Sequence, residues 1–218
     1  MEVIAAFQGP GLLMLSSASA GEPTMSTYHQ GQRDLQDAFG SRALADRLDE
    51  TLRHGEFTDR DAAFIAQQSF FFLATADADG RPDCSFKGGP PGFARVVAPD
   101  ALIFPDYDGN GMFRSLGNLT ANPHVGLLFL SVGERPQRLR VNGSAELLPD
   151  DPRRAEFPGA QLLVRVTPRD IFPNCPRYIP TLTVTTPSVH APQADRPAVE
   201  PDWKAHPLFA DLVPPRRA

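Results

Sequence analysis

The chain has 218 residues, of which 41% are hydrophobic and 22% charged, and its formal net charge at pH 7 is −5. This length corresponds to one domain with extensions or to two small domains, and the composition excludes a fully disordered or fibrous chain. The acidic balance argues against a general nucleic-acid-binding protein, because such proteins neutralise phosphates with a basic face.

The first 24 residues differ in character from the segment that follows them. They end in small residues that imitate a signal-peptidase site, but they carry Glu2 in place of a basic start, and a Gln-Gly-Pro-Gly stretch interrupts the apolar run. This run is also too short and too broken to span a membrane. We therefore expect residues 1–24 to be a non-native or disordered extension before a true start at Met25, with secretion as the less favoured alternative.

Two helical stretches are predicted before the first strand. Between residues 31 and 54, apolar side chains recur mostly at every fourth position, which is typical of an amphipathic helix, and Gly40 is expected to break or kink it. Thr58 and Asp61 have the spacing of a capping box, so a second short helix should run to about Gln68. We expect these helices to form a packing layer or a lid.

From residue 70 onward, the pattern changes to short apolar runs separated by turns rich in Gly, Asp, Asn and Pro, which is typical of antiparallel hairpins. A helix is expected between Met112 and Ala121, ending before Pro123, because the residue that precedes a proline disfavours the helical region. The expected strand segments are 70–75, 83–87, 93–97, 101–104, 125–130, 137–148 and 161–166. Counted as six or so short strands around one inserted helix, they predict a mainly β fold, a small six-stranded antiparallel barrel with peripheral helices.

The last third of the chain is rich in proline, with 14 of the 23 prolines at or after Pro149. Beyond Phe172 they recur every few residues, a spacing that no helix or central strand tolerates. The tail is therefore either disordered or extended over a partner surface, and its apolar residues favour docking of at least part of it. The expected domains are the extension 1–24, a barrel domain 25–180 and a Pro-rich C-terminal tail 181–218.

No metal site or disulfide framework is indicated. Cys84 and Cys175 are single and far apart, which fits a reducing cytoplasm. Residues 106–111 match the first half of an EF-hand loop, D-x-D-x-N-G, but the twelfth position is Gly117, where calcium requires a bidentate carboxylate. We therefore predict no metal.

Two segments carry the elements of an anion site. Asn110 is a candidate N-cap of the predicted helix, and Arg114 and Ser115 fall in its first turns, where unpaired N–H groups favour an anion. Lys87 ends a predicted strand and precedes two glycines, which allow the backbone to approach a ligand closely. Two cations that converge on a helix start would form a phosphate pocket. The alternative is a surface Arg and a surface Lys beside turn glycines.

Several segments, in order, resemble one protein family. They are FLAT at 72–75, DGRPD at 79–83, SFKGGPPGF at 85–93, LIFPD at 102–106, NLTANPHVGLLF at 118–129, LRVNGSA at 139–145 and NCPRYI at 174–179. The chain resembles the pyridoxamine 5'-phosphate oxidase-like family of FMN-binding split barrels, and within it a subgroup of predicted flavin-nucleotide-binding proteins. The resemblance covers residues 28–180 and implies a split β-barrel.

The resemblance also implies an FMN site. Lys87 matches the family's basic residue at the end of the second barrel strand, and Arg114 matches the arginine that opens the helix before the Asn-Pro turn. The family's neighbouring basic residue is Ser115 here, so we expect weaker phosphate binding unless Arg138 or Arg140 contributes. The expected cofactor-binding residues are Ser85, Phe86, Lys87, Gly88, Pro105, Asp106, Tyr107, Asn110, Arg114, Ser115, Arg138 and Arg140.

In function, the resemblance implies an FMN-dependent oxidoreductase that acts on a small molecule by hydride or electron transfer, as a cytoplasmic homodimer with flavin at the interface. A small barrel filled by its own side chains needs a second surface to enclose the flavin ring. Because the flavin carries the chemistry, no catalytic residue is assigned. Pyridoxamine phosphate is not the expected substrate, because a proline-rich tail replaces the family's basic last strand.

The alternative is a non-catalytic binder of flavin, deazaflavin or haem that acts as a carrier or sensor, since a fold does not determine a function. No nucleic-acid or membrane partner is expected.

Overall fold

The computed structural model describes residues 27–133, 136–184, 186–192, 195 and 199–215. The chain divides into two compact units, Met1–Leu52 and Arg53–Ala218, and each is described by itself. The predicted extension over residues 1–24 lies outside the described residues. Within these residues, no helix has both the length and the apolar character that crossing a membrane requires.

The described part of the first unit, residues 27–52, contains two helices, α1 (Gln30–Ala38) and α2 (Arg42–Leu52). The predicted break at Gly40 is confirmed: its φ of +62° lies in the left-handed region that favours glycine. An ion pair of 2.6 Å between Arg33 Nη1 and Asp46 Oδ1 joins the two helices. Their role as a packing layer or a lid stays a prediction.

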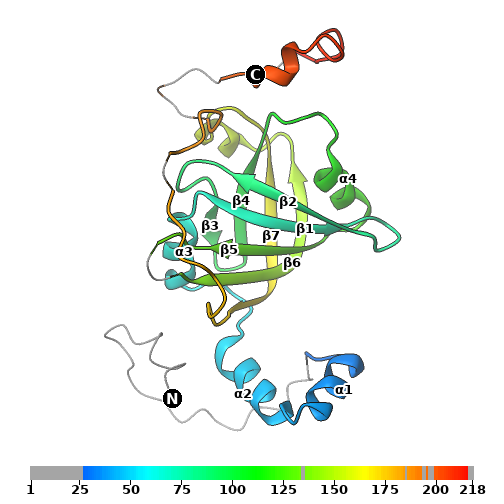
Figure 1. Ribbon diagram of the computed structural model, residues 1–218, viewed down its shortest axis with the longest axis vertical. Helices are drawn as coiled ribbons and strands as arrows, with labels where there is room; N and C mark the ends of the chain where they lie inside the picture. The colour runs from blue at the N-terminus through cyan, green and yellow to red at the C-terminus, as the bar shows by residue number, and fades with distance from the viewer. Residues whose placement is uncertain (1–26, 134–135, 185, 193–194, 196–198, 216–218) are drawn as a thin grey trace. The chain divides into compact units, whose positions relative to one another are not determined.

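The second unit is built on one antiparallel sheet of seven strands in the order β2-β1-β5-β6-β7-β4-β3 (Figure 1). The prediction counted six or so strands in the barrel; the sheet has seven, and each overlaps one of the seven predicted segments. The strands are β1 (Phe70–Ala76), β2 (Pro82–Gly88), β3 (Arg95–Ala98), β4 (Ala101–Tyr107), β5 (His124–Leu130), β6 (Arg138–Leu148) and β7 (Ala160–Pro173).

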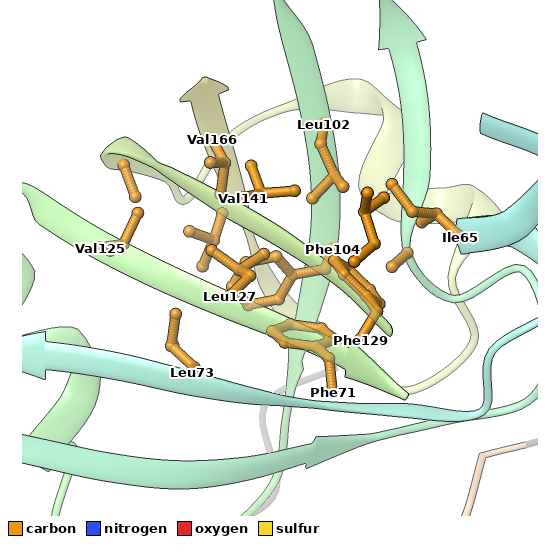
Figure 2. Close-up of a cluster of buried hydrophobic side chains, with 14 of the residues drawn as sticks. Ile65, Phe71, Leu73, Leu102, Phe104, Val125, Leu127, Phe129, Val141 and Val166 are labelled. Carbon is orange, nitrogen blue, oxygen red and sulfur yellow. The ribbon is translucent and has the colours of Figure 1, made fainter. Parts of the chain in front are cut away.

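The sheet curls around a core of buried side chains, as expected of a split barrel. Phe71 of β1 lies near one end of the strand order and Phe104 of β4 near the other, yet their ring centroids are only 5.0 Å apart. Phe129 of β5 lies at the same distance from Phe71, and Figure 2 shows these rings packed among Leu and Val side chains of β1, β4, β5, β6 and β7. The interior is therefore filled by the protein itself, and a ligand site must lie outside it.

Strand β7 is longer than the predicted segment 161–166. It continues past Pro168, where its pairing register with β6 shifts between Asn142 and Gly143. Gly143 of β6 is required at that point, because a Cβ atom there would lie 2.0 Å from the Thr167 carbonyl oxygen. The close approach allows β7 to pair with β4 through its first half and with β6 along most of its length.

Helix α3 (Asp59–Ala66) begins with the predicted capping box. Thr58 Oγ1 accepts the Asp61 N–H at 3.2 Å, and Asp61 Oδ2 accepts the Thr58 N–H at 2.9 Å. The buried Asp61 carboxylate also lies 2.8 Å from His54 Nε2, and His54 forms a backbone bridge with Ile171 of β7. These bonds hold the start of α3 to the barrel.

Helix α4 (Arg114–Ala121) packs against β1, β2 and β6 and lies beside the sheet in Figure 1. The prediction that Asn110 caps it is wrong. Phe113 is the N-cap residue, in a left-handed conformation with φ of 48°, while Asn110 Oδ1 accepts the Met112 N–H at 3.0 Å. The Asn side chain thus forms a local turn that competes with helix formation, and α4 begins after it.

The described part of the tail contains turns as well as extended chain. Leu182 forms a bridge with Gly133, and a short 3₁₀ helix, η3 (Asp202–Ala205), follows Pro201. A proline at the start of a turn loses no hydrogen bond, so this spacing permits one turn before Pro207. A second 3₁₀ helix, η2 (Pro152–Glu156), precedes β7.

Candidate functional site

One cleft of the second unit brings the predicted segments together. It has a volume of about 670 Å³ and is lined by β2, the loop between β4 and α4, the first turn of α4 and part of residues 199–215, which we call the C-terminal segment. This volume is within the range of roughly 300–1,000 Å³ that is typical of small-molecule sites.

Nine of the twelve residues predicted to bind the cofactor line this cleft, including Lys87, Arg114 and Ser115. The other three do not. Pro105 is buried on β4, and Arg138 and Arg140 lie on β6, outside the lining that the described residues form. The predicted convergence of Lys87 with the start of α4 is thus present, whereas the predicted support from β6 is not brought to the cleft.

Hydrogen bonds between side chains tie the first turn of α4 to β2. Ser115 Oγ donates to Ser85 Oγ at 2.9 Å and lies 3.4 Å from Asp83 Oδ2, and Ser115 is buried. Arg114 Nε lies 3.6 Å from Asp83 Oδ1, while its side chain stays 71% exposed. The serine hydroxyl therefore fixes the helix start, and the guanidinium remains accessible.

The second cation is more enclosed. The Lys87 side chain is 19% exposed, and its Nζ lies 3.9 Å from Asp106 Oδ1. Burial raises the pKa of the Asp106 carboxyl and Asp108 adds to this, while the nearby Lys87 ammonium opposes it. Burial thus disfavours the ionised form of the Asp106 carboxyl group, and Lys87 is the positive charge that lies beside it.

The protein has a second cleft, with a volume of about 710 Å³. Tyr107, at the end of β4, lines both clefts. Burial raises the pKa of its hydroxyl to about 12 despite the opposing charge of Arg95. The hydroxyl therefore keeps its proton at neutral pH and can donate a hydrogen bond. Phe86 also lines both clefts and is 63% exposed, which gives them a shared apolar wall.

The two glycines after Lys87 serve the protein's own side chains. A Cβ atom on Gly88 would lie 2.7 Å from the Phe86 ring, and one on Gly89 would lie 2.7 Å from Phe93. The Cβ positions of both glycines are therefore occupied by aromatic rings, while Gly88 still lines the cleft. That the backbone there admits a ligand stays a prediction.

The cleft also contains residues that the site prediction missed. Asp83 lies beside Arg114, and the C-terminal segment contributes Trp203, Lys204 and Phe209. A compositional signal was available for two of them, since Trp203 is the single tryptophan of the chain and Lys204 is one of two lysines against 19 arginines.

The arrangement suits an anion beside an apolar, partly planar group. Lys87, the Arg114 guanidinium, the Ser85 hydroxyl and the positive end of the α4 dipole favour a phosphate or carboxylate. Asp83 and Asp106 reduce that attraction, because each lies within 4.0 Å of one of the cations. Among the described residues, no three His, Cys, Asp or Glu side chains are grouped as metal ligands would be.

Comparison with known proteins gives one family. The model of the family described as pyridoxamine 5'-phosphate oxidase matches residues 57–175, which is more than half of the chain. This match covers every strand and α4. No curated protein matches the chain.

The solved structures that resemble this chain share little sequence identity with it. A candidate pyridoxamine 5'-phosphate oxidase from Lactobacillus delbrueckii is 22% identical, with 56% of this chain and 99% of that chain covered and a TM-score of 0.43. A FAD-binding protein from Mesorhizobium loti is 17% identical, with coverages of 56% and 97% and a TM-score of 0.39. HutZ, the heme storage protein of Vibrio cholerae, is 19% identical, with coverages of 49% and 86% and a TM-score of 0.38.

Proposed function

The chain belongs to the pyridoxamine 5'-phosphate oxidase family, and on that premise we propose that its cleft binds FMN. We further propose that the protein is an oxidoreductase that transfers a hydride or electrons between the flavin and a small molecule other than pyridoxamine phosphate. The proline-rich chain that follows β7 is the reason for excluding that substrate, since it replaces the family's basic last strand.

The observation that carries this proposal is the convergence of Lys87, Arg114 and Ser115 on one cleft. Lys87 and Arg114 come from β2 and α4, elements that are distant in sequence, and their charges suit the phosphate of a flavin nucleotide. Ser115 fixes the helix start through its hydrogen bond to Ser85, and the two cations fit the phosphate group. Asp83 and Asp106 make the fit weaker than two unpaired cations would.

When bound, the flavin supplies the redox chemistry, and the protein binds, orients and shields it. Phe86 offers an exposed aromatic face at the cleft, and the Tyr107 hydroxyl offers a donor that stays protonated at neutral pH. No histidine is among the described residues that line this cleft, which favours flavin over haem, whose iron is commonly held by histidine.

We also propose that the flavin lies at the interface of a homodimer. On the outer face of the barrel, Phe86 stacks on Phe70 with a centroid separation of 5.3 Å, and Phe72 meets both rings edge-on at 6.0 Å. Phe86 is exposed and the other two rings are half-buried, and a partly exposed aromatic cluster beside a ligand cleft is typical of an interaction surface. A second copy of the chain, seated there, would enclose the ring that the filled barrel cannot hold.

The test is titration of the full chain with FMN and with riboflavin, which lacks the phosphate. Lys87→Ala and Arg114→Ala should each weaken FMN binding by about 1.5–3 kcal/mol, the range for hydrogen bonds to charged groups, and leave riboflavin binding nearly unchanged. Arg81→Ala is the matched control, since Arg81 is 73% exposed in the β1–β2 turn and does not line the cleft. Unchanged FMN affinity in both variants would remove the phosphate site from this cleft.

The visible spectrum of the purified protein and anaerobic reduction with NADH and NADPH test the chemistry. Bound FMN that a nicotinamide reduces supports the oxidoreductase, and bound FMN that no nicotinamide reduces favours a carrier. A haem spectrum, or a protein that takes up no flavin, would overturn the proposal. Light scattering of the wild type and of Phe86→Ser tests the dimer, which the variant should weaken.

A further inference from the structure

We propose that Trp203 and Phe209 are ligand-contact residues of the cleft and that Lys204 is the positioning residue that holds them there, an inference that rests on the proposed function. All three residues belong to the C-terminal segment, and each lines the cleft. The segment would thus supply a wall of the flavin site that lies outside the region matched by the family, which ends at residue 175.

Lys204 anchors the C-terminal segment through contacts with two carboxylates. Its Nζ donates to Asp108 Oδ2, in the loop between β4 and α4, and lies 3.1 Å from Glu200 Oε2. The Lys204 side chain is only 13% exposed, and the hydrogen bond with Asp108 raises its pKa. An ammonium that is already engaged by two carboxylates is poorly available to a ligand phosphate, so its effect is to anchor the segment beside the cleft.

The anchored segment presents an aromatic pair. Trp203 lies next to Lys204, and its ring meets the Phe209 ring edge-on at a centroid distance of 6.3 Å. Both side chains are partly exposed, Trp203 at 41% and Phe209 at 46%, although they line the cleft. Exposed aromatic faces beside a cleft offer stacking or edge contacts to a planar ring.

The two lysines of the chain both lie at this cleft, each beside a carboxylate. The chain has only two lysines, and both Lys87 and Lys204 line this cleft. Lys87 lies beside Asp106 of β4 and Lys204 beside Asp108 in the loop that follows, so two carboxylates two residues apart each meet one lysine. The contact of Lys204 with Asp108 thereby lies directly after the end of β4, next to the candidate phosphate site.

The single tryptophan makes the first experiment direct. Without any flavin, acrylamide quenching of Trp203 fluorescence measures how accessible the segment is. We expect Lys204→Gln and Asp108→Asn to raise the quenching constant toward that of a free tryptophan, and Lys204→Arg, which keeps the charge, to stay near the wild type. Equal quenching constants in the wild type and all three variants would show that Lys204 does not anchor the segment.

The second experiment adds FMN to the same full-length proteins. Phe209→Ala should weaken FMN and riboflavin alike by about three- to tenfold, the range of aromatic ring pairs, because the contact is with the ring. Leu208→Ala is the matched control, since the neighbouring Leu208 is 70% exposed and does not line the cleft. FMN should also quench Trp203 emission, and less so in Lys204→Gln.

The outcomes separate the two proposals. If the wild type binds FMN and Lys87→Ala weakens it, while Phe209→Ala and Leu208→Ala both bind as the wild type does, the inference about the C-terminal segment is wrong and the proposed function stands. If the wild type binds neither FMN nor riboflavin, the proposed function fails, and the ligand contacts inferred here fail with it.

Discussion

Ser115, in the first turn of α4, donates a hydrogen bond to Ser85 of β2 across 2.9 Å, although 30 residues separate them in the chain. This bond sets where the helix start lies relative to β2, the strand that carries Lys87. The two cations proposed to hold the flavin phosphate, Lys87 and Arg114, are therefore positioned by a contact between two uncharged serines.

Replacing Ser115 by alanine should cost about 1 kcal/mol of unfolding free energy, the usual net value of a hydrogen bond, because the half-buried Ser85 and Asp83 lose a partner. FMN affinity should fall as well, since the start of α4 is then less firmly held. Urea unfolding and FMN titration measure the two effects. Thr120→Ala is the control: Thr120 is exposed on the same helix, and stability should change by less than about 0.5 kcal/mol. Equal stabilities of the two variants would contradict this role.

Replacing Asp83 by asparagine should strengthen FMN binding by about 0.5–1 kcal/mol, in the range of exposed ion pairs. The change removes a negative charge 3.6 Å from Arg114 Nε and leaves the guanidinium to the phosphate. Titration calorimetry with FMN checks this, and riboflavin should show no gain. Asp79→Asn, in the exposed β1–β2 turn, serves as the control for net charge. Weaker FMN binding by Asp83→Asn would mean that the carboxylate positions Arg114 instead of competing for it.

Tyr107 should make the protein lose stability at high pH. Burial raises the pKa of its hydroxyl from 10.0 to about 12, so the unfolded chain releases this proton first. Stability is therefore fully present below pH 10 and falls as the pH rises to 12, by about 2–3 kcal/mol for a shift of this size. Denaturant titrations at several pH values should show this loss in the wild type and a smaller one in Tyr107→Phe. An identical pH profile for both proteins would exclude Tyr107 as its source.

Gly143 should tolerate no side chain. Gly143→Ala places a Cβ atom 2.0 Å from the Thr167 carbonyl oxygen, at the point where β7 bends past Pro168. We expect a loss of more than about 3 kcal/mol in unfolding free energy, as for other severe backbone clashes, or failure to fold. Gly117→Ala is the control, since nothing lies within 4 Å of its added Cβ and alanine favours a helix by up to about 1 kcal/mol. A stable Gly143→Ala protein would mean that β6 and β7 can separate locally.

The sequence by itself determined most of the elements of this protein. Strand and helix periodicity and the capping box of Thr58 with Asp61 are local patterns, so they were predictable without any contact between distant residues. The same applies to Lys87 at the end of a strand and Arg114 in the first turn of a helix. The start of α4 was misplaced, because the Asn110 side chain satisfies a turn as well as it would a helix.

Only the tertiary structure decided which side chains meet. Curling of the sheet and docking of α4 bring Asp83 and Asp106 to the two cations, and these carboxylates weaken the charge that the sequence suggested. The C-terminal segment reaches the cleft through Lys204 and Asp108, 96 residues apart. Contacts at such separations follow from strand pairing and packing, which no local pattern encodes. The cations, Asp106, Phe86 and Tyr107 could therefore be anticipated at the cleft, but not Asp83, the pairing of each cation with a carboxylate, or the aromatic residues of the C-terminal segment.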